Sequence, residues 1–187
     1  MMLKESPLKG MIAGNNATVT IRELADIHTI DLRVTPGSPS YDTIAQSLDI
    51  DLTQPGKTST NLVSSAGEIY ALCLAPDWWL ILGYKDAQQS LSQLQANNDY
   101  HFSLVNVSGQ RTTIELEGPN AREVLAHLWE QDLREKSFPV GAVSQGLMAK
   151  APVIVWHIAP FRYRIMVRSS FALHVWKCLV DAAEELG

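Results

Sequence analysis

The sequence lacks the motifs that mark most self-contained enzymes. It contains no GxGxxG after a predicted strand, no Walker loop, no GxSxG and no HExxH, which argues against a nucleotide-dependent enzyme, a serine hydrolase and a zinc protease. Its histidines fall at no metal-ligand spacing, and structural or surface roles are the common ones for single histidines. They are His28, His101, His127, His157 and His174. We therefore predict no catalytic residue and no metal ligand in this chain.

Cysteine is also scarce. The chain has two, Cys73 in an apolar strand segment and Cys178 in an apolar helix segment, and no CxxC motif. Free thiols in apolar surroundings are favoured over a disulfide or a zinc site.

Charge is low for a protein of this size. Only 19% of residues are charged and 46% are hydrophobic, so the chain can fill a core and has a surface that partner proteins could cover. The net charge of −5 argues against nucleic acid or an anionic membrane as a partner. The N-terminus does not resemble a signal peptide, and no stretch approaches the ~20 apolar residues of a membrane helix. We expect a soluble, cytoplasmic protein.

The segment 105–128 is the clearest structural signal that is present. Its residues TIELE, 113–117, alternate as in a half-buried strand, with Ile114 and Leu116 on one face. Gly118-Pro119 then ends the strand, and the apolar residues that follow are spaced as on one face of a helix. The segment therefore predicts a strand, a polar turn, a second strand, a tight turn and a helix.

The rest of the chain repeats runs of strands followed by one helix. Hairpins are predicted for 17–34, with a turn at Ala25-Asp26, and for 69–82, while helices are predicted for 41–48 and after Asp86. Three further strands between 143 and 168 predict a meander, and a final helix is expected to be capped by Ser169 or Ser170. This order predicts an α+β fold, an antiparallel sheet with helices on one side.

For the domain organisation we expect an N-terminal arm over residues 1–16 and a single α+β domain over 17–187, with an alternative division near 98–102. The arm carries several apolar residues. Such an arm usually lies against its own domain or against another chain.

Three sets of residues are candidates for a ligand site or an interface. Asn106, Ser108 and Arg111 lie in a polar turn between two strands; Arg111 could hold a carboxylate, but a turn that satisfies its own backbone is the favoured alternative. Trp78, on one side of its strand, could anchor an interface. Arg162, Arg164 and Arg168 share one face of a strand and form either a solvated face or a basic docking stripe for an acidic partner.

Several longer segments resemble the gamma subunit family of heterotetrameric sarcosine oxidase, in order and in spacing along almost the whole chain. They are ESPLKG (5–10), APDWWLIL (75–82), VNVSGQRTTIELEGPNAREVL (105–125), DLREKSFPVGAVSQ (132–145) and VRSSFALHVWKCLVDAAEELG (167–187). The family is similar in turn to the folded domain of folate-binding aminomethyltransferases, which implies the same α+β architecture.

The resemblance implies a place in a complex with alpha, beta and delta subunits that oxidatively demethylates sarcosine to glycine. The one-carbon unit passes to tetrahydrofolate or leaves as formaldehyde, with hydrogen peroxide as co-product. It implies FAD and FMN, NAD, zinc and tetrahydrofolate on the other subunits, and no cofactor on this chain. We expect a non-catalytic subunit that helps to hold that complex together.

One departure from the family bears on the second hypothesis, a stand-alone tetrahydrofolate-binding one-carbon transfer protein. The family usually has Asp-x-Ser-Asp-Gly-Arg-Thr around the polar turn, where this chain has NVSGQRT at 106–112. The turn thus lacks both acidic groups that could accept a proton or hold a pterin.

Overall fold

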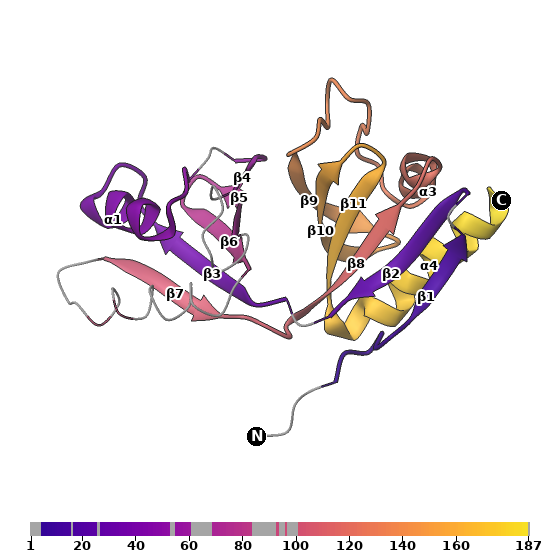
Figure 1. The fold of residues 1–187 in the computed structure, drawn as a ribbon, viewed down its shortest axis with the longest axis horizontal. Coiled ribbons are helices and arrows are strands. Elements are labelled where there is room, and N and C mark those ends of the chain that lie inside the picture. The colour runs from indigo at the N-terminus through magenta and orange to yellow at the C-terminus, as the bar shows by residue number, and fades with distance from the viewer. Residues whose placement is uncertain are drawn as a thin grey trace. The chain divides into compact units, whose positions relative to one another are not determined.

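The computed structural model describes residues 5–15, 17–25, 27–52, 55–60, 69–83, 93, 96 and 101–186. The chain forms two compact units (Figure 1). Unit 1 combines residues 1–26 with 109–187, and unit 2 consists of residues 27–108. This differs from the expected division into an arm and one domain. Residues 1–26 and 109–187 belong to one unit because β2 (Val19–Leu24) pairs with β8 (Arg111–Glu117), and the residues between these two segments form unit 2.

Unit 1 contains a six-stranded antiparallel sheet with the order β1-β2-β8-β11-β10-β9. Its strands are β1 (Ile12–Asn15), β2 (Val19–Leu24), β8 (Arg111–Glu117), β9 (Val143–Met148), β10 (Ala151–Ala159) and β11 (Arg162–Arg168). The predicted meander is confirmed, since β9, β10 and β11 are consecutive antiparallel neighbours. The predicted arm contributes β1, which pairs with β2, and its Leu8 is fully buried. The arm therefore packs on its own unit.

The core of unit 1 lies between this sheet and two helices. The helices are α3 (Ala121–Leu128) and α4 (Ala172–Glu185), which follows the short 3₁₀ turn η1 (Ser169–Phe171). Ile114 and Leu116 of β8 share one buried cluster with Val124 of α3 and Leu179 of α4. The alternation of TIELE and the helical stripes are confirmed, and they bring both helices onto one face of the sheet (Figure 1).

Unit 2 contains a five-stranded antiparallel sheet with the order β4-β5-β6-β3-β7. Its strands are β3 (Thr29–Val34), β4 (Thr58–Thr60), β5 (Tyr70–Ala75), β6 (Trp78–Leu82) and β7 (Phe102–Asn106). Helix α1 (Pro39–Leu48) begins after Ser38, whose side chain accepts a hydrogen bond from the Tyr41 N–H. Leu32, Ile44 and Trp79 belong to the buried cluster of this unit. The α+β class is thus confirmed in each unit.

Two local predictions were wrong. The expected hairpin at Ala25-Asp26 does not form, because β2 pairs with β8 whereas β3 pairs with β6 and β7. The last helix has no side-chain cap from Ser169 or Ser170. Ser169 instead donates its hydroxyl to the Gly109 carbonyl at 2.9 Å and its N–H to the Gln110 carbonyl at 3.1 Å.

The helix predicted after Asp86 lies outside the described residues. Among the described helices, none is long and apolar enough to cross a membrane.

Candidate functional site

Three arginines surround one carboxylate on the face of the unit 1 sheet that faces away from Ile114 and Leu116. Arg22 of β2 and Arg164 of β11 stand opposite Glu115 of β8 in the two flanking ladders. Their Nε atoms donate to Glu115 at 3.0 and 3.1 Å. Arg162, which stands opposite Glu117 two residue pairs further along, reaches the same carboxylate at 3.0 Å. Strand pairing alone therefore assembles this cluster.

Glu115 is fully buried, whereas the side chains of Arg22, Arg162 and Arg164 are 41%, 32% and 18% exposed. Burial by itself raises the pKa of Glu115, but the hydrogen bonds from the three guanidinium groups outweigh it and hold that pKa below its usual value. The carboxylate stays ionised at neutral pH and accepts hydrogen bonds. A group held in this way is a poor proton donor or general base.

This arrangement decides what the arginines of β11 do. Arg162 and Arg164 are committed to Glu115, and Arg164 also lies 5.2 Å from the centre of the Trp156 ring. Arg168 lies at the other end of the strand, exposed and opposite Arg111 in the ladder. The three candidates on this strand therefore belong to two different surroundings.

The polar turn satisfies its own backbone, as the favoured interpretation predicts. The Ser108 N–H donates to the Asn106 side-chain oxygen at 2.9 Å. The Thr29 N–H donates to the Ser108 hydroxyl at 2.9 Å, beside the bond from the Val107 N–H to the Thr29 carbonyl. Asn106 and Ser108 belong to unit 2 and Arg111 to unit 1. The turn is thus divided between the units and ties the end of β7 to β3.

Trp78 is engaged within unit 2. Its indole N–H donates to Asp31 at 2.9 Å, and the guanidinium of Arg33 lies 4.1 Å from the centre of its ring. Such a cation–π contact uses the ring face that an interface anchor would offer. The next residue, Trp79, is buried and meets Tyr41 edge to face.

The described residues hold no group of three or more His, Cys, Asp and Glu side chains that could bind a metal ion. Both cysteines are free; Cys73 is buried and Cys178 is partly buried. Burial raises the pKa of the Cys73 thiol to about 11, although a hydrogen bond with the backbone of Ala75 opposes the shift. The Cys73 thiol is therefore protonated at neutral pH and is a poor metal ligand or nucleophile.

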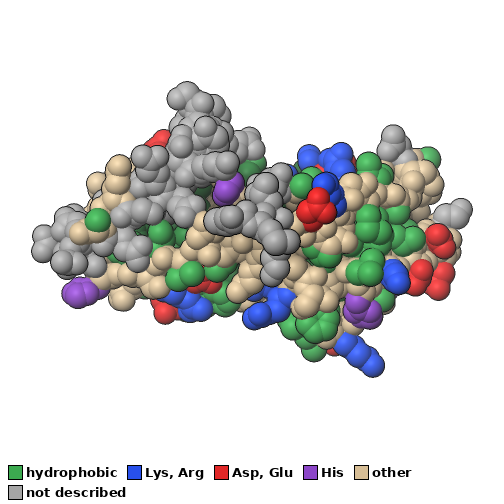
Figure 2. All heavy atoms as spheres, turned by 90° about the horizontal axis from the view of Figure 1, so that it is seen from below, with side chains coloured by type: hydrophobic (Ala, Val, Ile, Leu, Met, Phe, Trp, Pro, Cys, Tyr) green, Lys and Arg blue, Asp and Glu red, His purple; other side chains and the backbone are tan. Residues whose placement is uncertain are grey.

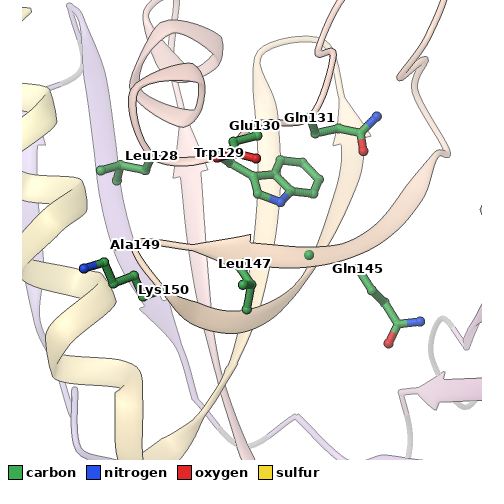
Figure 3. Close-up of a pocket in the computed structure, with 9 residues that line it drawn as sticks. Leu128, Trp129, Glu130, Gln131, Gln145, Leu147, Ala149 and Lys150 are labelled. Atoms are coloured by element: carbon green, nitrogen blue, oxygen red, sulfur yellow. The ribbon is translucent and has the colours of Figure 1, made fainter.

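A hollow of about 560 Å³ lies along the outer edge of the unit 1 sheet, between residues 128–131 and β9 (Figure 3). Figure 3 shows the indole of Trp129 over β9, with Gln145 toward one end of the hollow and Lys150 toward the other. Trp129 also forms an isolated bridge with Met148. None of the seven candidate residues is among the described residues that line this hollow.

Gly146 is required where Trp129 covers the strand. A Cβ at this position would lie 2.6 Å from the Trp129 Nε1 atom. We expect Gly146→Ala to lower the free energy of unfolding by about 1–3 kcal/mol, because the indole must shift within a packed core. Urea denaturation followed by tryptophan fluorescence measures this loss. The control is Gln145→Ala at the exposed neighbour, which should change stability by less than about 0.5 kcal/mol; equal effects of the two changes would contradict the explanation.

Arg22 and Glu115 are the residues that reasoning from the sequence missed. Glu115 lies on the opposite face of β8 from Ile114 and Leu116, and on a sheet with one face in water that position would be exposed. The signal that could have found them is the pair Arg162 and Arg164, which share one face of their strand. If that strand is central in the sheet, its arginines need acidic partners on a neighbouring strand. Only the order of the strands shows that Glu115 is that partner.

Comparison with known proteins adds a family assignment. A model described as "Sarcosine oxidase, gamma subunit family" matches residues 37–185. The sarcosine oxidase subunit gamma of Corynebacterium sp. (strain P-1) is 28% identical over 183 residues, which cover 98% of this chain and 87% of that protein. The corresponding subunit of Corynebacterium sp. (strain U-96) is 31% identical over 176 residues, which cover 93% of this chain and 83% of that protein.

Solved structures agree with this assignment. A chain of heterotetrameric sarcosine oxidase from Corynebacterium sp. U-96, in complex with pyrrole 2-carboxylate, matches with a TM-score of 0.85 and 26% identity, covering 98% of this chain and 96% of that chain. Aminomethyltransferase T of the glycine cleavage system from Bartonella henselae matches with a TM-score of 0.63 and 14% identity, covering 88% of this chain and 46% of that chain. The second likeness shows a shared fold alone.

Proposed function

The chain belongs to the sarcosine oxidase gamma subunit family, and from that premise we propose that it is a non-catalytic subunit that helps to hold a sarcosine oxidase complex together. The observation that carries the proposal is the match, over 98% of this chain, to a chain of a heterotetrameric sarcosine oxidase. A match of that extent supports the view that this chain keeps the whole shape of a subunit.

The chemistry of the described candidates supports a structural role. Glu115 is held ionised by three arginines. Trp78 is held by Asp31 and Arg33. These groups form their ion pairs and hydrogen bonds with other residues of the same chain. Groups held in this way stabilise the fold more readily than they transfer protons.

We infer further that the complex has alpha, beta and delta subunits besides this one. In this proposal it oxidatively demethylates sarcosine to glycine. Dioxygen accepts the two electrons and becomes hydrogen peroxide, and the methyl carbon leaves as formaldehyde or as methylene-tetrahydrofolate. FAD, FMN, NAD, zinc and tetrahydrofolate belong to the other subunits. The support is the family to which the chain belongs.

Co-expression tests this role. With a tag on this chain and the three other subunits expressed beside it, we expect one complex to be captured that produces hydrogen peroxide from sarcosine. Expression of the other subunits without this chain should give less assembled complex. A chain that is captured alone would refute the proposal, as would a full yield of active complex without it.

Titration with tetrahydrofolate separates the subunit role from the stand-alone one-carbon transfer protein. The purified chain alone should show no change in tryptophan fluorescence up to high micromolar tetrahydrofolate. Saturable quenching would favour the stand-alone protein, because the pterin would then have a site on this chain.

A further inference from the structure

One end of unit 1 is basic, and three elements form it. The turn between β9 and β10 contributes Lys150, the end of β11 contributes Arg168, and the second turn of α4 contributes Lys177; all three are exposed. The helix start is fixed against the turn, because the His174 Nε2 atom lies 2.8 Å from the Ala149 carbonyl oxygen. We call this surface the basic end.

The strand register adds apolar residues beside these charges. Pro152 stands opposite Leu147, and Val153 stands opposite Val167. Pro152 and Arg168 are each the next residue beyond the Val153–Val167 pair, and Leu147 lies on the next strand, opposite Pro152. Leu147 is 62% exposed, and Phe171 and Leu173 at the helix start are 42% and 46% exposed. Exposed apolar and aromatic groups among cations have the composition of interface hot spots.

The electrostatic potential of the basic end comes from more than its side chains. Helix α4 begins there with no acidic residue in its first turn, so its N-terminal end adds partial positive charge. Glu184 and Glu185 lie at the far end of α4, whereas Asp181 follows Lys177 by one helical turn and Glu130 borders the same hollow as Leu147 and Lys150. Figure 2 shows hydrophobic and basic side chains close together on part of the face that it draws, with acidic side chains elsewhere on the same face.

We propose that the basic end docks an acidic, partly apolar segment of another subunit of the complex. Charge complementarity carries this choice of partner: the protein as a whole has a net charge of −5, so a local positive surface would steer an acidic partner to one place. The inference rests on the proposed function, and it names the surface through which that function is exerted.

Charge reversal within the full complex tests the inference. The double variant Lys150→Glu, Arg168→Glu should reduce capture of the other subunits by about tenfold or more. Raising the salt concentration should weaken capture of the wild-type chain and have little effect on the variant. The fold should persist, because both residues are exposed and Arg168→Glu places a carboxylate opposite Arg111. The neutral variant Lys150→Ala, Arg168→Ala should give an intermediate loss.

The matched control reverses two exposed lysines elsewhere in unit 1, Lys9→Glu and Lys136→Glu. It makes the same change in net charge and should leave capture unchanged. If the Lys150→Glu, Arg168→Glu variant and the control variant both capture the other subunits as well as the wild-type chain does, the inference is overturned and the proposed function stands. If the wild-type chain itself captures no subunit, the proposed function fails and this inference fails with it.

Discussion

Glu115→Ala is expected to lower the free energy of unfolding by about 3–5 kcal/mol, the usual cost of removing one partner from a buried ion pair. Glu115 is fully buried and receives hydrogen bonds from Arg22, Arg162 and Arg164. Without it, three guanidinium groups repel one another, and Arg164, only 18% exposed, has little access to water. Urea denaturation at neutral pH measures the loss.

Glu117 supplies the control for this experiment. It lies two residues further along β8, is 48% exposed, and contacts Arg22 at 3.3 Å and Arg162 at 3.9 Å. Glu117→Ala should cost less than about 1 kcal/mol, because water screens exposed pairs. Equal losses for the two variants would show that burial of Glu115 is not what makes the cluster important.

The same carboxylate predicts the sign of a pH dependence. The pKa of Glu115 in the folded protein lies below its ordinary value of 4.5, so the unfolded chain binds this proton more readily. Its contribution to stability is complete above that ordinary value and is lost as the pH falls through the folded pKa. The stability difference between the wild-type chain and Glu115→Gln should therefore shrink on acidification. A difference that stays constant from pH 7 to pH 3 would contradict this.

Gly118→Ala is expected to destabilise the protein by about 3 kcal/mol or more, through backbone strain and overpacking together. Gly118 has φ +140°, and a Cβ on it would lie 2.5 Å from the Thr18 carbonyl oxygen and 2.9 Å from the Val19 Cα. Both neighbours are backbone atoms, so no side chain can move aside. The carbonyl of Thr18 also accepts the Asn120 N–H at 3.0 Å, so its displacement would disturb the turn into α3.

The control for Gly118 is Gly10, which lies in the same unit. It has φ +71° with nothing within 4 Å of the position of a Cβ, so Gly10→Ala should cost only about 1–2 kcal/mol for the left-handed backbone. Thermal unfolding of the two variants gives the comparison. If Gly118→Ala unfolds at the same temperature as Gly10→Ala, the close approach to Thr18 has no energetic weight.

Predictions from the sequence were confirmed where the interacting residues lie close together along the chain, and they failed where those residues lie far apart. The alternation of Ile114 and Leu116, the Gly118-Pro119 turn and the stripe on α3 act within a few residues, and the structure confirms them. The resemblance to the gamma subunit family could also be recognised from the sequence, because it rests on the order of short segments along the chain.

Strand partners were predicted correctly for neighbours such as β9, β10 and β11, but partners far apart in sequence were not predicted. The short connection at Ala25-Asp26 predicts a hairpin, yet β2 and β3 enter different sheets, and β7 and β8 do the same on either side of the polar turn. A short loop permits a hairpin but does not force one. Instead β2 forms a ladder with β8, and β3 forms one with β6. Ile21 of β2 and Leu32 of β3 are fully buried there, and burial of apolar side chains stabilises such pairing.

By itself, then, the sequence determined the type of most elements, the α+β class, and which face of β8 and α3 is buried, since local periodicity governs these. Only the tertiary structure decided that the chain closes into two units, that Glu115 meets arginines from two neighbouring strands, and that Arg168 is separated from Arg162 and Arg164. The physical reason is that pairing partners are selected by the summed burial and hydrogen bonding of whole strands, which no single segment encodes.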